Sequence, residues 1–136
     1  MPAPCAFDYA VVRVVPRVQR EEFVNVGVVL HAPARAFLGC EIAFDPPRLS
    51  SLAPDLSAAD LARIDAHLEA WRAVCAGDPA AGPIARLPPS ERFHWLVAPR
   101  STILQTSPVH AGVTEDPRAA LGHLFAQLVP APLPKR

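Results

Sequence analysis

Lysine is nearly missing from this sequence, and neither sign of charge is in excess. Thirteen basic and thirteen acidic residues cancel over 136 residues; Lys135 is the only lysine, and the other basic residues are arginines. A neutral chain lacks the overall positive field that drives non-specific binding to DNA or RNA. Nucleic acid is therefore not a favoured partner, and any anion site must be local. The first explanation for the excess of arginine is the coding bias of a GC-rich genome. The second is that arginine suits bidentate contacts with phosphate.

Cysteine is scarce as well. Cys5, Cys40 and Cys75 are odd in number, widely spaced and without a C-x-x-C pair, and the histidines show no H-x-H or H-x-x-x-H spacing. These patterns argue against a disulfide framework and against a zinc site. We expect no metal, no cofactor and a reducing, cytoplasmic location.

Long apolar runs and familiar catalytic signatures are also absent from the sequence. No segment approaches the roughly 20 apolar residues that span a bilayer, and no basic start leads into an apolar run. We therefore expect no membrane partner. The sequence contains no P-loop, G-x-G-x-x-G, H-E-x-x-H or G-x-S-x-G motif, so a binding protein is favoured over an enzyme.

Three strand-like segments fill the first third of the chain. Residues 7–16, 23–31 and 36–44 are rich in β-branched and aromatic side chains, and short links join them, which predicts a three-stranded antiparallel meander. Alternation in the second segment predicts one face formed by Val24, Val26, Val28 and Leu30. Gly27 inside so strong a strand predicts a bulge or a close approach of backbone or ligand.

Two main helices are predicted in the remainder. Ser57 and Asp60 have the spacing of a capping box before an apolar stripe that ends at Gly77. Asp116 and Pro117 predict the start of a second helix that runs to about residue 128.

The segments between these helices are less clearly patterned. Residues 90–98 fit a strand or a short helix capped by Ser90, and we favour the helix. Residues 101–107 and 109–113 have the composition of one or two further strands.

The prediction is therefore an α+β fold: an antiparallel sheet, with the N-terminal three-stranded meander plus one or two later strands, covered by two main helices. Its length suits a single domain over residues 1–136. We expect a core over about residues 7–129 and a Pro-rich C-terminal tail, residues 130–136, that frays.

Polar side chains gather in two stretches, one around the turn at residues 17–22 and the other over residues 91–112. Forked arginine donors outnumber acids in both, which favours binding of a carboxylate or phosphate. The alternative is an exposed network of arginine–glutamate pairs that only holds the hairpin together. Trp95 could stack a base, although a partly buried position in the core is favoured. The candidate ligand-binding residues are Arg13, Arg17, Arg20, Glu22, Asn25, Arg92, Arg100, Ser101, Gln105, Ser107 and His110.

Three segments of the chain resemble a known bacterial family, the domain of unknown function numbered 3037. They are residues 9–30, with the run P-R-x-x-R-x-E-F-x-N-x-G, residues 90–117, with R-S-T-x-x-Q-x-S-P-x-H, and L-x-x-L-F-x-x-L-V at residues 121–129. The resemblance places the family's polar signature on the same candidate residues. It also implies an accessory role beside a kinase-like protein partner.

Three functions remain in view from the sequence. The first is a binding or accessory module with an arginine-rich site for an anionic or nucleotide-like ligand or a protein partner. The second is a structural adaptor without a ligand. The third is an enzyme that acts on a phosphate-containing or nucleic-acid substrate with His110 as general base.

Overall fold

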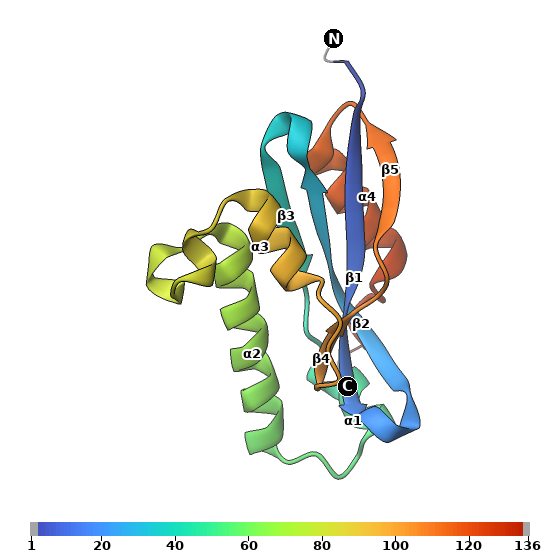
Figure 1. Ribbon diagram of the computed structural model, residues 1–136. Helices are drawn as coiled ribbons and strands as arrows, with labels where there is room; N and C mark the ends of the chain where they lie inside the picture. Colours follow the sequence, from blue (N-terminus) through green and yellow to red (C-terminus); the bar gives the residue numbers. More distant parts are fainter. Residues whose placement is uncertain (1–2, 135–136) are drawn as a thin grey trace.

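A computed structural model describes residues 3–134 and is built around one five-stranded sheet (Figure 1). The N-terminal meander is present as β1 (Cys5–Arg17), β2 (Glu22–Ala32) and β3 (Phe37–Ile42), in the order β3-β2-β1. Both later strands also form: β5 (His110–Thr114) pairs with the first part of β1, and β4 (Leu104–Thr106) pairs with β1 further along, at Val12 to Val14. Every pairing is antiparallel.

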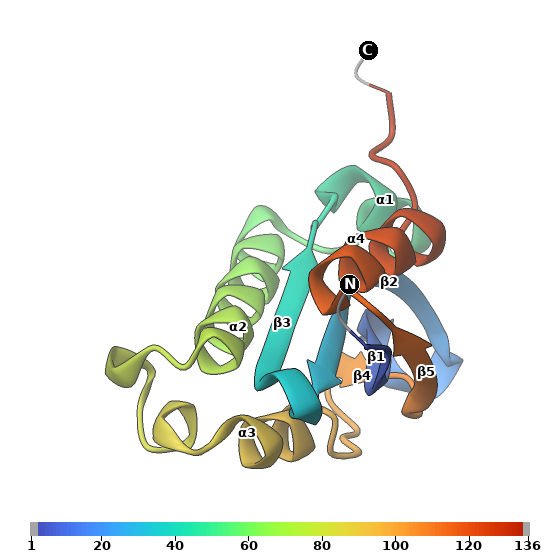
Figure 2. The same ribbon diagram turned by 90° about the horizontal axis from the view of Figure 1, so that it is seen from above.

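Helices cover both faces of this sheet. Two of them, α2 (Ala58–Ala76) and α3 (Pro89–Leu96), pack with one face, whereas α4 (Pro117–Leu128) packs with the other (Figure 2). The short helix α1 (Pro46–Leu52) adds Leu49 to the core under α2 and α3. The predicted α+β class is therefore confirmed. In the part of the chain that the structure describes, no helix has the length and apolar character needed to cross a membrane.

Two hydrophobic cores result, one on each face. The larger joins Val12 and Val14 of β1 with Leu49, Leu68 and other buried residues of α1 to α3. The smaller joins residues of β1 and β2 with Leu121 of α4. Because side chains of a strand alternate between faces, β1 and β2 each supply residues to both cores.

Gly27 lies beside a bulge in β2. Val12 pairs with Gly27 but Arg13 pairs with Asn25, so Val26 is an extra residue on β2. A Cβ on Gly27 would lie 2.5 Å from the carbonyl oxygen of Glu41. The predicted bulge and the predicted close approach are both confirmed.

The same bulge corrects the predicted faces of the second strand. Val26 belongs to the core under α2, whereas Val28 and Leu30 belong to the core under α4. The prediction of one shared face was wrong because the extra residue reverses the alternation at that point.

Helix ends follow the sequence in most places. Ser57 and Asp60 form the capping box of α2, Gly77 ends it in the left-handed conformation, and Asp116 caps α4. The segment at 90–98 is helical, as favoured, but Ser90 does not cap it. The helix starts at Pro89, its N-cap is Pro88 without a side-chain cap, and the Ser90 hydroxyl lies 3.4 Å from Nε2 of His31.

The proline-rich tail makes two contacts with the start of α1. The Nη2 group of Arg48 donates to the carbonyl of Ala131 (2.7 Å), and the backbone amide of Leu133 donates to Oδ2 of Asp45 (2.9 Å). These contacts link the tail to the start of α1, its expected fraying stays a prediction, and residues 135–136 lie outside the described chain.

Candidate functional site

The two polar stretches meet at the middle of the sheet. Arg13 on β1 pairs with Asn25 on one side and with Gln105 of β4 on the other. A hollow of about 300 Å³ opens beside it, which we call the arginine hollow. Its lining residues are Arg13, Val15, Val18, Glu21, Phe23, Arg100, Ser101 and Gln105.

The guanidinium of Arg13 is held in place without an acidic partner. It lies 4.0 Å from the centroid of the Phe23 ring, a cation–π arrangement. No carboxylate of residues 3–134 forms an ion pair with it, and its Nε is buried without a hydrogen-bond partner. Burial also lowers the pKa of Arg13. A partly desolvated cation of this kind would be stabilised by an anion in the hollow.

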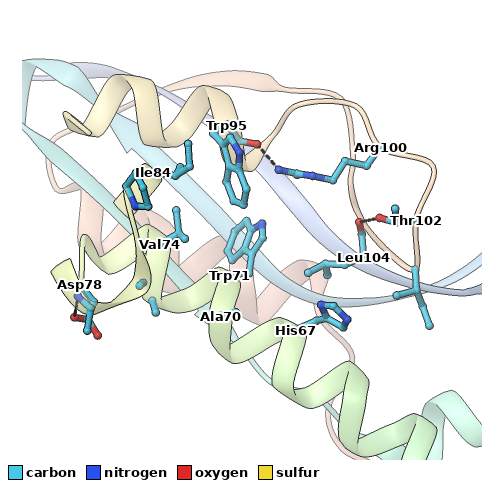
Figure 3. Close-up of a pocket in the computed structure, with 15 residues that line it drawn as sticks. His67, Ala70, Trp71, Val74, Asp78, Ile84, Trp95, Arg100, Thr102 and Leu104 are labelled. Atoms are coloured by element: carbon cyan, nitrogen blue, oxygen red, sulfur yellow. Dashed lines mark hydrogen bonds between the residues drawn. The ribbon is translucent and has the colours of Figure 1, made fainter. Parts of the chain in front are cut away.

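Arg100 has a different role. Its guanidinium reaches over Trp95, 4.6 Å from the ring centroid, and donates to the carbonyls of Trp95 (2.6 Å) and Leu96 (2.9 Å) (Figure 3). These are the last carbonyls of α3, where a cation is favoured by the helix dipole. Arg100 thus fixes the segment between α3 and β4, and desolvation lowers its pKa.

The other candidate residues at the hairpin point elsewhere. Arg17 forms an ion pair with Asp55, and Arg20 pairs with Glu22 at 2.5 Å. Asn25 donates to the carbonyl of Leu128 (3.0 Å), which ties β2 to the end of α4. None of these four predicted residues lines the arginine hollow.

Two further candidates of the second stretch also have structural contacts. Arg92 donates to the carbonyl of Leu87 (2.6 Å). Ser107 is buried, accepts from the amide of Val11 (2.8 Å) and donates to the carbonyl of Pro108 (2.9 Å).

His110 lies away from the arginine hollow. It pairs with Tyr9 on β1, and the two rings are 5.4 Å apart. Arg13 is four residues further along this strand, or about 13 Å at about 3.3 Å per residue. A general base at His110 therefore does not lie beside Arg13. Over residues 3–134 there is also no cluster of three or more histidine, cysteine or acidic side chains that could hold a metal ion.

The model of a protein family of unknown function, DUF3037, matches residues 9–129. The chain belongs to this family. No curated protein and no solved structure matches the sequence. The resemblance noted in the sequence is thereby confirmed, and the function of this DUF3037 protein has to be argued from its own geometry.

A larger hollow of this DUF3037 chain was missed by the sequence analysis. It measures about 830 Å³ and lies between α2, α3 and residues 100–104, next to the short turns that follow α2 (Figure 3). Trp71 and Trp95 both line it, and we call it the tryptophan hollow. Trp95 is 39% exposed and belongs to neither hydrophobic core, whereas the favoured interpretation was a partly buried core position. Its proximity to Arg100 in sequence was the one available signal.

Proposed function

We propose that this DUF3037 protein is a non-catalytic binding module that holds an anionic group, a carboxylate or phosphate, against Arg13 in the arginine hollow. The supporting observation is the missing acidic partner of Arg13. Arg17 and Arg20, on the same hairpin, each have a carboxylate within the chain, whereas Arg13 has none among residues 3–134.

The surroundings of Arg13 suit recognition of a forked anion. Stacking on Phe23 restricts the orientation of the guanidinium plane, so less conformational entropy is lost when an anion binds its edge. Ser101 adds a hydroxyl to the lining. Phe23 is 43% exposed and offers an apolar contact to the rest of a ligand.

Glu21 is the one acid in the lining of this hollow. It stands at the end of the turn between β1 and β2, with φ of 55°, and makes no ion pair with Arg13. Its negative charge opposes that of an incoming anion. Removing this charge should therefore strengthen binding.

The two other functions considered from the sequence fit less well. A pure adaptor would pair its hairpin arginines internally, and Arg13 is not paired in this way. An enzyme with His110 as base would need that histidine close to the arginines, and the register of β5 keeps it about 13 Å along β1 from Arg13. The anion itself can belong to a nucleotide-like molecule or to an acidic or phosphorylated side chain of a protein partner, such as a kinase-like one.

Thermal unfolding in the presence of adenosine monophosphate, inorganic phosphate and N-acetylglutamate tests the proposal. A ligand at about 100 times its dissociation constant stabilises a protein by about 2.7 kcal/mol. We expect stabilisation of the wild type by at least one of these probes, loss of that effect in Arg13→Gln and a stronger effect in Glu21→Gln.

Arg118→Gln is the matched control, because Arg118 also lies over an aromatic ring, that of Phe37 at 5.3 Å, but outside the hollow. It should respond like the wild type. Equal stabilisation of Arg13→Gln and wild type would contradict the proposal. So would the absence of any effect together with the failure of an immobilised acidic or phosphorylated peptide to retain the protein through Arg13.

A further inference from the structure

We infer that the tryptophan hollow is a second binding site, which shares only Arg100 with the lining of the arginine hollow, and that it takes a planar aromatic ligand with one negatively charged group. Its volume of about 830 Å³ is within the range of about 300–1,000 Å³ typical of small-molecule sites. Three features of its lining support this inference: the two indoles, an unpaired indole N–H and an uneven distribution of charge.

The two indoles come from two different helices and both line the hollow. Trp71 projects from α2 and Trp95 from α3, and their side chains point toward one another (Figure 3). Val74, Ile84 and Leu104 complete an apolar lining. Aromatic faces of this kind favour a flat ring by stacking, beyond the gain from burying apolar area.

Trp71 carries an unsatisfied donor. The residue is 4% exposed, and its Nε1 is buried without a hydrogen-bond partner. An unpaired buried N–H is costly, and most native structures avoid it. A ligand in the hollow that offers a hydrogen-bond acceptor to this N–H would remove that cost.

Charge differs between the two ends of the hollow. Arg100 and His67 lie toward one end, and Asp78 lies at the other (Figure 3). The carboxylate of Asp78 already accepts from the amide of Ala80 (3.0 Å). The guanidinium of Arg100 uses two of its N–H groups on helix carbonyls and retains others, because a guanidinium has five. A negative group of the ligand should therefore lie at the Arg100 end.

Nuclear magnetic resonance can observe this site directly, because the two tryptophans of the chain both line it. Their indole N–H signals are assigned with Trp71→Phe and Trp95→Phe. The probes are 2-naphthoate, with ring and charge, 2-naphthol, with the ring alone, and cyclohexanecarboxylate, with the charge alone. We expect saturable shifts of both signals with 2-naphthoate, and affinities at least about tenfold lower for the other two probes.

Variants separate this site from the proposed anion site. Arg100→Gln should reduce the affinity for 2-naphthoate to that for 2-naphthol. Because Arg100 also caps α3, His67→Leu on the exposed side of α2 provides a second test: it removes a ring N–H donor at the same end of the hollow, with a several-fold loss for 2-naphthoate and a smaller loss for 2-naphthol. Arg13→Gln should bind 2-naphthoate like the wild type, whether or not the arginine hollow binds anions.

Three outcomes would overturn the inference. The first is no saturable shift of either indole signal up to about 1 mM 2-naphthoate. The second is equal affinity of the wild type for 2-naphthoate and 2-naphthol. The third is loss of 2-naphthoate binding in Arg13→Gln, which would assign the ligand to the other hollow.

Discussion

At position 27, the neighbouring backbone leaves no room for a side chain larger than that of glycine. A Cβ at this position would lie 2.5 Å from the carbonyl oxygen of Glu41 and 2.9 Å from Cγ1 of Ile42. We expect Gly27→Ala to lower the free energy of unfolding by about 1–3 kcal/mol, because β2 and β3 must move apart to admit the methyl group. Urea unfolding measures this loss.

Gly122→Ala is the control for that substitution. Gly122 lies within α4, and the nearest atom to an added Cβ is Oε1 of Glu41 at 3.6 Å, which is an ordinary contact. Because alanine favours a helix over glycine by about 1 kcal/mol, this variant should be more stable than the wild type. Equal losses in both variants would show that crowding at Gly27 is not the cause.

The candidate site could be predicted from the sequence only in part, because the contacts of individual side chains decide which residues line it. Arginine-rich stretches suggested an anion site, and four of the eleven candidates do line the arginine hollow. Which arginine remains unpaired depends on partners far away in the chain. Arg17 forms an ion pair with Asp55, and the side-chain amide of Asn25 donates a hydrogen bond to the carbonyl of Leu128. No local pattern shows such pairings.

At the scale of elements, the two serines proposed as caps give a matched test. Ser57 accepts from the amide of Asp60 (3.1 Å), and Asp60 accepts from the amide of Ser57 (2.9 Å). Ser57→Ala should cost about 1 kcal/mol of unfolding free energy. Ser90→Ala should lower the free energy of unfolding little through loss of a helix cap, since α3 has no side-chain cap. Thermal unfolding of both variants compares them, and a larger loss in Ser90→Ala would contradict the assignment.

Elements with a strong local pattern were the ones that the sequence predicted well. The meander, α2 and α4 all have regular apolar spacing and identifiable ends. The short helix α1 was missed, because two adjacent prolines indicate a break, although Pro46 and Pro47 occupy the first turn of a helix, where a missing N–H costs nothing. The faces of β2 were mispredicted because a bulge is defined by its partner strand.

In the molecule as a whole, β1 and β2 each contribute buried side chains to both hydrophobic cores. Ala10, Val12 and Val14 of β1 pack under α1 to α3, whereas Cys5 and Phe7 of the same strand pack under α4. If β1 or β2 leaves the sheet, buried residues of both cores become exposed. The two hollows also belong to this arrangement, because residues 100–105 form part of the lining of both.

We therefore expect the molecule to unfold as one cooperative unit. Leu68 in the larger core and Leu121 in the smaller are each 1% exposed, so Leu68→Ala and Leu121→Ala should each lower the free energy of unfolding by about 2–5 kcal/mol. Both tryptophans lie on the α2 side, so their fluorescence follows that core, whereas far-ultraviolet circular dichroism follows every helix. The two signals should change together in both variants, because β1 and β2 link the cores. Leu133→Ala, at a residue 38% exposed, is the control and should change stability little. A dichroism transition that precedes the fluorescence transition in Leu121→Ala would instead mean that α4 detaches on its own.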